Sequence, residues 1–174
     1  YYTQSMLDAH NDSLKGKKIK ISGSGNVALY ALQKANELGA KVITVSDSDG
    51  FIYDPDGIDY SAVKEIKEIE RGRIKEYAQK VSTAHYMEGS VWNYDIDYDV
   101  ALPCATQNEI DQKQAELMVK DHVKYICEGA NMPSMPEAIK TYNENNIYYG
   151  PAKAANAGGV AVSALEMSQN SERL

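Results

Sequence analysis

Apolar residues recur along this chain with two alternating periods. A short apolar run at Ile19–Ser22 predicts a strand, and the stretch 26–38 after it carries apolar residues at the spacing of one helical stripe. Gly39 closes that stretch, as glycine commonly does at the end of a helix. A second apolar run, Lys41–Ser46, predicts another strand. Strand, helix and strand in this order indicate a β–α–β unit.

The alternation continues over the rest of the chain. Turn signals on both sides of 51–53 predict a short hairpin or excursion there. Further strands are predicted at 84–86, 98–102, 124–127 and 146–149, and further helices at 1–12, 61–79 (interrupted at Gly72), 109–121 and 136–145. Strands separated by helices form a parallel sheet that is covered on both faces. The sequence therefore predicts an α/β fold: a Rossmann-like, doubly wound, mainly parallel sheet with helices on both faces.

Composition narrows the class of protein. The chain has 174 residues, 43% of them apolar, which is enough for one domain with a full core over 1–174. Its net charge of −7 argues against nucleic-acid binding, which needs a basic face. No apolar run approaches the ~18 residues that a membrane-spanning helix requires. The chain begins with Tyr1 rather than Met, so we expect it to be a piece of a longer protein.

The cysteines and histidines do not form a metal site. Cys104 and Cys127 have no C-x-x-C spacing and no nearby histidine, and the three histidines have no spacing of a catalytic or metal-binding set. We expect two buried, reduced thiols in a cytoplasmic protein and no metal. Trp92, in a Gly-Ser-Val-Trp-Asn loop, is interpreted as a packing anchor.

The turn between the first strand and the first helix carries the strongest functional signal. Gly23, Gly25 and Ala28 match the G-x-G-x-x-G/A pattern of a dinucleotide-binding turn. Gly23 allows the tight turn, Gly25 lets a pyrophosphate approach the backbone, and the free N–H groups at the helix start face its charge. Asp47, at the end of the second strand, lies close to the ~20-residue spacing at which an acidic group meets the adenosine ribose.

Polar loops follow five of the predicted strands, at 23–25, 46–49, 103–108, 128–133 and 150–159, and three of them carry glycine. Right-handed crossovers place the carboxyl ends of parallel strands along one edge of the sheet. Ligands bind along that edge in open α/β sheets. We therefore expect these loops to form one binding site.

Taken together, the loops resemble the coenzyme-binding domain of the hexameric glutamate dehydrogenases. The matching segments are SGSGNVA at 22–28, SDS at 46–48, LPCATQN at 102–108, EGANMP at 128–133 and KAANAGGVAVS at 153–163. The resemblance implies NAD(P)-linked oxidative deamination of L-glutamate to 2-oxoglutarate and ammonia, and its reverse, in a homo-hexamer. The catalytic lysine and aspartate of that family lie on a separate N-terminal substrate domain that this chain does not match. The chain alone is thus expected to bind coenzyme without catalysing the reaction.

The resemblance also implies site residues. The pyrophosphate would be cradled by Gly23, Ser24, Gly25, Asn26 and Val27. The coenzyme path would be lined by Ala105 and Thr106, and the nicotinamide ribose would meet Ala130 and Asn131. The carboxamide would be held by Asn156, and the glutamate side chain would contact Val160 and Ser163. The last two are three positions apart on a predicted helix and so face one way. One departure is Ala164, where many members carry glycine, and its methyl group bears on the side-chain pocket.

The choice between NADP and NAD depends on the second loop. Asp47 alone favours NAD, because a carboxylate accepts from ribose hydroxyls and repels a 2′-phosphate. The flanking Ser46 and Ser48 resemble the NADP-preferring branch of the family. A cation must then offset Asp47: Lys67 matches a lysine of that branch, and Arg71 or Arg73 are candidates to assist it. We expect NADP, with NAD as the alternative.

Two other functions fit the same sequence. One is another amino-acid dehydrogenase, specific for leucine, valine or phenylalanine. Ser163 argues against it, because a branched-chain pocket favours an apolar residue. The other is a dinucleotide-binding module without chemistry of its own.

Overall fold

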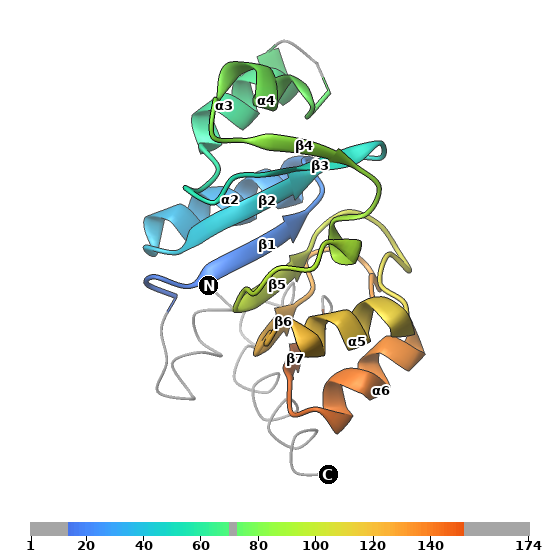
Figure 1. Ribbon diagram of the computed structural model, residues 1–174. Helices are drawn as coiled ribbons and strands as arrows, with labels where there is room; N and C mark the ends of the chain where they lie inside the picture. Colours follow the sequence, from blue (N-terminus) through green and yellow to red (C-terminus); the bar gives the residue numbers. More distant parts are fainter. Residues whose placement is uncertain (1–13, 70–72, 152–174) are drawn as a thin grey trace.

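The computed structural model describes residues 14–69 and 73–151. Its central feature is one seven-stranded sheet in the order β4-β3-β2-β1-β5-β6-β7 (Figure 1). The strands are β1 Lys18–Ser22, β2 Lys41–Ser46, β3 Gly50–Tyr53, β4 His85–Glu88, β5 Val100–Pro103, β6 Tyr125–Cys127 and β7 Tyr148–Gly150. The helices are α2 Asn26–Glu37, α3 Tyr60–Lys64, the π-helix η1 Glu65–Ile69, α4 Glu76–Lys80, the 3₁₀ turn η2 Val91–Asn93, α5 Gln112–Lys120 and α6 Pro136–Glu144.

The sheet is parallel at its centre and antiparallel at one edge. β1 pairs in parallel with both β2 and β5, and β6 and β7 continue the parallel part. β3 runs antiparallel to β2 and to β4. The chain therefore winds outward from β1 in one direction and then, after β4, in the other. Such a reversal creates a crevice at the carboxyl ends of the central strands, where open α/β sheets bind ligands.

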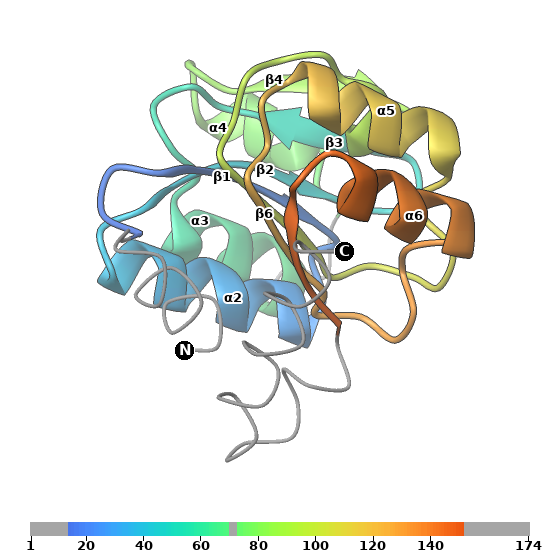
Figure 2. The same cartoon turned by 90° about the horizontal axis from the view of Figure 1, so that it is seen from below.

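Helices cover both faces of the sheet. α2 and α3 lie on one face, and α5 and α6 lie on the other (Figure 2). Alternate residues of each central strand enter two separate cores: Val100 and Leu102 of β5 pack on the α2 side, and Ala101 packs on the α5 side. The predicted doubly wound α/β fold is confirmed, since a mainly parallel sheet of seven strands has helices on both of its faces.

Several strands begin or end one or two residues from their predicted bounds, and two helical segments differ more. The charged stretch 61–79 is helical with a break, as predicted, but α3 continues directly into the π-helix η1, and α4 begins only at Glu76. The helix predicted from 109 begins at Gln112, because Asp111 is its N-cap and forms a capping box with Gln114. Glu109 is thereby left outside the helix. The helix predicted at 1–12 lies outside the described residues.

None of the helices in the described part of the chain is long and apolar enough to cross a membrane.

Candidate functional site

The glycine turn after β1 is fixed by its neighbours on both sides. Gly23 has φ +90°, and a Cβ atom there would lie 2.9 Å from the carbonyl oxygen of Cys104, so the position requires glycine. Its N–H donates to Ser46 Oγ at 2.7 Å, and its carbonyl accepts from the N–H of Ser46 at 3.1 Å. The turn is thus tied to the end of β2, and Ser46 is buried in that contact.

The N-terminus of α2 is open. Gly25 is the N-cap residue, and no side-chain hydrogen bond caps the helix there. A Cβ atom built on Gly25 would meet nothing within 4 Å, so the backbone can be approached closely. The first N–H groups of a helix have no intrahelical partner and carry partial positive charge. Asn26 and Val27, the first two helical residues, are exposed beside this end.

A pocket of about 630 Å³ lies at the carboxyl ends of β1, β2 and β5. Eight predicted site residues line it: Gly23, Ser24, Gly25, Ser46, Asp47, Ser48, Ala105 and Thr106. Ser22, Gly89, Ser90, Val91, Cys104 and Glu109 complete the lining. The structure therefore brings these eight residues together in the crevice where the winding of the sheet reverses. Asn156, Val160 and Ser163 lie outside the described residues.

Asp47 is surrounded by hydrogen-bond donors. Oδ1 accepts from the N–H groups of Asp49 at 2.9 Å and Gly50 at 3.1 Å, and Oδ2 accepts from that of Ile74 at 3.0 Å. The Nε atom of Arg73 lies 3.4 Å from Oδ2. Desolvation opposes ionisation of this carboxyl group, but the three N–H groups and Arg73 outweigh it and lower its pKa. A carboxylate has about four lone-pair directions, and four donors surround this one.

Arg73 also contacts Ser48, the residue that follows Asp47 in the chain. Its NH2 group donates to Ser48 Oγ at 2.7 Å and to Asp49 Oδ2 at 2.9 Å. Its side chain is 51% exposed, so the guanidinium group is open to a ligand. Among the predicted cations, Arg73 lies beside Asp47. Lys67 lies on η1, away from the pocket lining, and Arg71 lies outside the described residues.

Sequence reasoning missed Glu109. Its Oε2 atom accepts from the N–H groups of Ala105 at 3.1 Å and Thr106 at 2.9 Å. Its Oε1 atom accepts from the indole N–H of Trp92 at 2.6 Å. Two signals pointed to this arrangement: the capping box that begins α5 after Glu109, and a buried tryptophan, whose N–H usually needs a partner. Trp92 is a packing anchor as predicted, and it is also a hydrogen-bond donor.

The loop after β6 is joined to the loop after β5. The N–H groups of Gly129 and Ala130 both donate to the carbonyl of Pro103, at 2.8 and 3.0 Å. The N–H of Asn108 donates to the carbonyl of Met132 at 3.0 Å. Ala130 therefore lies beside the pocket loop, and Asn131 is exposed next to it, although neither lines the pocket itself.

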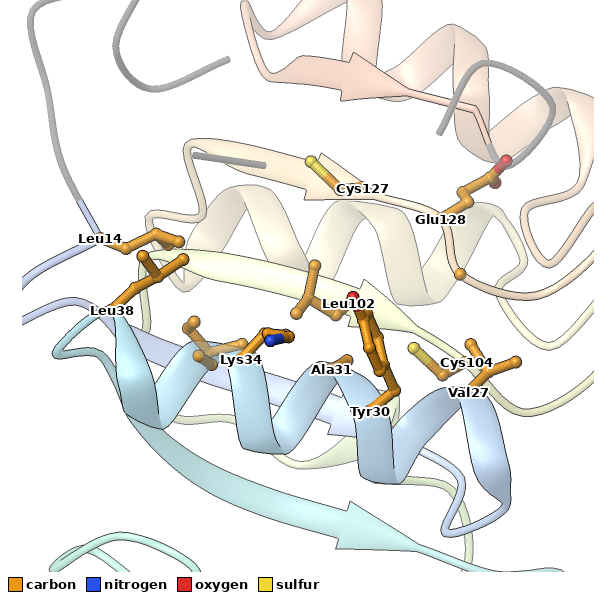
Figure 3. A pocket seen from close by; sticks show the side chains of 13 residues that line it. Leu14, Val27, Tyr30, Ala31, Lys34, Leu38, Leu102, Cys104, Cys127 and Glu128 are labelled. Atoms are coloured by element: carbon orange, nitrogen blue, oxygen red, sulfur yellow. The ribbon is translucent and has the colours of Figure 1, made fainter. Parts of the chain in front are cut away.

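A smaller, mainly apolar hollow of about 170 Å³ lies on the α2 side of the sheet (Figure 3). Val27 and Cys104 lie at one end of it, and Leu14 and Leu38 lie at the other. Burial, and then the charges of Glu109 and Cys127, raise the pKa of Cys104 to about 12. This thiol is therefore protonated at neutral pH and a poor nucleophile. Within the described residues, no group of three His, Cys, Asp or Glu side chains is placed to hold a metal ion.

Comparison with known proteins gives one consistent result. The family model for Glutamate/Leucine/Phenylalanine/Valine dehydrogenase matches residues 1–174. The chain is 50% identical over 177 residues to the NAD(P)-specific glutamate dehydrogenase of Xylanibacter ruminicola, covering 100% of this chain and 39% of that protein. It is 48% identical to the NADP-specific glutamate dehydrogenase of Haemophilus influenzae, with the same coverage.

Solved structures agree with these relatives. Plasmodium falciparum glutamate dehydrogenase 2 superposes with a TM-score of 0.86 at 48% identity, covering 100% of this chain and 39% of that one. A second glutamate dehydrogenase structure from the same organism gives 0.85 at 46% identity, covering 98% and 37%. The chain thus spans about two fifths of the length of the relatives it matches.

Proposed function

Because this chain belongs to the Glutamate/Leucine/Phenylalanine/Valine dehydrogenase family, we propose that it binds NADP(H) for a glutamate dehydrogenase. The reaction is hydride transfer between the coenzyme and L-glutamate, with 2-oxoglutarate and ammonia on the other side. The nicotinamide ring supplies or accepts the hydride when the coenzyme is bound. We assign no acid–base residue to this chain, so its own work is to bind and orient the coenzyme. On its own it is expected to be inactive.

The residues of the pocket fit a dinucleotide. The open N-terminus of α2 beside Gly25 offers unpaired N–H groups to a pyrophosphate. Ser46, Asp47 and Ser48 line the same pocket from the end of β2, where the adenosine ribose is held in such folds. Ala105 and Thr106 line it from the end of β5 and so extend it on the other side of β1.

The single observation that favours NADP over NAD is the crowding of Asp47 by donors. An aspartate selects NAD by accepting hydrogen bonds from the ribose hydroxyls. Three backbone N–H groups and Arg73 surround this carboxylate, so little acceptor capacity is left for a ribose. The exposed guanidinium group of Arg73 reaches Ser48 and presents the planar donor set that suits a phosphate. The NADP-specific names of relatives support the same choice.

The roles of six further residues stay predictions, as do the homo-hexamer and the cytoplasmic location. These residues are Lys67, Ala130, Asn131, Asn156, Val160 and Ser163.

Parallel titrations with NADPH and NADH test the proposal. We expect NADPH to bind at least tenfold more tightly, a difference of about 1.4 kcal/mol.

Arg73→Ala should remove most of that preference by weakening NADPH alone. Lys80→Ala, which removes an exposed cation of the nearby helix α4, is the matched control and should change neither affinity. Lys67→Ala separates the two cations: a full NADPH preference in this variant would count against Lys67. Equal or tighter binding of NADH by the unmodified chain would overturn the assignment.

A further inference from the structure

Two walls of the large pocket come from segments that are separate in the chain. One wall is Cys104, Ala105 and Thr106 after β5, and the other is Gly89, Ser90 and Val91 before and within η2. Glu109 lines the pocket between them and bonds to both segments through different oxygens. One oxygen holds the two N–H groups of the β5 loop, and the other holds the indole of η2.

The turn η2 is itself well anchored. Trp92 is 2% exposed, and its backbone N–H is capped by Ser90 Oγ at 3.2 Å. Gln114 of α5 donates to Ser90 Oγ at 3.3 Å and to Asn93 Oδ1 at 3.1 Å. The indole therefore offers Glu109 a fixed donor, and Glu109 fixes the more exposed β5 loop against it.

The hydrogen bonds also decide which groups the β5 loop presents to the pocket. Ala105 and Thr106 are exposed, and their N–H groups point at Glu109. The negative charge of Glu109 is offset by three N–H donors. A carboxylate whose lone pairs are taken up in this way can line a pocket for an anionic ligand with less repulsion than a free one.

We propose that Glu109 is a positioning residue for the coenzyme: it holds the β5 loop and the η2 turn in the arrangement that admits the part of the dinucleotide beyond its adenosine half. The role rests on the proposed binding of NADP(H). It differs from a general contribution to folding, because it predicts a loss confined to ligands that extend past the Ser46–Ser48 end of the pocket.

The test compares Glu109→Gln with Glu116→Gln. Both replace a carboxylate by an amide of the same shape, but Glu116 is exposed on α5 and bonds to Gln112. The amide at position 109 keeps one acceptor oxygen and turns an NH2 group toward donors. We expect the Kd for NADPH to rise about tenfold in Glu109→Gln. The affinity for adenosine 2′,5′-bisphosphate, which contains only the adenosine half, should stay within about twofold. Glu116→Gln should change neither affinity.

Trp92 supplies a readout that does not depend on any ligand. It is the only tryptophan of the 174-residue chain, so its emission can be excited selectively. A negative charge at the pyrrole N–H stabilises the excited indole, so Glu109→Gln should shift its emission to shorter wavelength. Hydrogen exchange at the amides of Ala105 and Thr106 should become faster in the same variant. Trp92→Phe removes the indole donor and part of the buried ring system but keeps an aromatic side chain, and it should weaken NADPH binding by a smaller factor, about threefold.

The outcomes separate the two proposals. Unchanged NADPH affinity in Glu109→Gln, or an equal loss for NADPH and the bisphosphate, would overturn the positioning role. If the unmodified chain binds neither ligand, the coenzyme proposal fails, and the positioning role fails with it. The emission and exchange measurements then still report whether Glu109 joins the two loops. If Glu109→Gln does not fold, Trp92→Phe decides: NADPH affinity equal to that of the unmodified chain would count against the role.

Discussion

Both faces of the sheet carry an apolar core, but the α5 face adds a buried charged group, and β1 shows the contrast most directly. Ile19 and Ile21 enter a core on the α2 side that consists of aliphatic and aromatic side chains. Lys20, between them, is 1% exposed on the other side. Its Nζ atom donates to the carbonyls of Val91 at 3.1 Å and Tyr94 at 2.5 Å. One face is held by apolar packing, and the other includes buried polar anchors.

The polar anchors of the second face lie where the pocket needs fixed walls. Lys20 holds the η2 turn from the strand side, as Glu109 holds it from the loop side. The ammonium group also lies 4.6 Å from the ring centroid of Tyr98, a favourable cation–π distance. Desolvation lowers the pKa of Lys20 to about 8, although Asp121 and Asp95 oppose this. The comparison suggests that the apolar face mainly sets stability and the polar face mainly sets the shape of the site.

The largest expected effect breaks the apolar face. Leu32 of α2 is fully buried in its core, and Leu32→Ala leaves a cavity there. We expect a loss of about 3 kcal/mol in the free energy of unfolding, measured by urea denaturation. NADPH affinity of the protein that remains folded should change less than about twofold. Asn36→Ala, at an exposed position of the same helix, should cost under about 0.5 kcal/mol. A large loss of NADPH affinity in Leu32→Ala would contradict the view that the α2 face mainly sets stability.

How far the sequence predicted this molecule depends on the range of each interaction. The β–α–β unit and the glycine turn follow from local spacing, and Ser46 and Asp47 follow from their place after a strand. The partners of Lys20 are more than 70 residues away in the chain, so local sequence patterns do not predict these contacts. The indole of Trp92 meets Glu109 only because α5 begins three residues later than its apolar period suggests. Arg73 follows Asp47 in the chain only after β3, α3 and η1, so local spacing does not pair the two residues.

Lys20→Met tests the polar face with a smaller effect. Methionine has a similar length and removes the buried charge, but it leaves the carbonyls of Val91 and Tyr94 without this donor. Removing the buried charge stabilises the fold and losing the two hydrogen bonds destabilises it. The free energy of unfolding at neutral pH should therefore stay within about 1 kcal/mol of that of the unmodified chain. The η2 wall should loosen, and NADPH should bind about fivefold more weakly in a fluorescence titration. This pattern is the reverse of that for Leu32→Ala. A stability loss as large as that of Leu32→Ala, with affinity intact, would mean that Lys20 serves only the core.

The smallest expected effect concerns Asp121, which is buried on the polar face at the C-terminal end of α5. Burial, and then the hydrogen bond and charge of Asp95, raise its pKa to about 7. The partial negative charge at a helix C-terminus disfavours the carboxylate as well. With a raised pKa the folded state holds its proton more tightly than the unfolded state does. The stability that this supplies is therefore complete below the unfolded pKa of about 3.9 and is lost as the pH rises through about 7.

Asp121→Asn keeps the neutral form at every pH and should remove this dependence. Relative to the variant, the unmodified chain should lose stability between pH 5 and pH 8, by under about 1 kcal/mol, because solvent screens the exposed Asp95. Urea unfolding at both pH values measures the difference. Glu116→Gln is the control, since Glu116 is an exposed carboxylate of α5 that bonds to the uncharged side chain of Gln112. If the stability difference between Asp121→Asn and the unmodified chain is the same at both pH values, Asp121 is ionised throughout. The polar face would then carry a buried charge that its neighbours fully compensate.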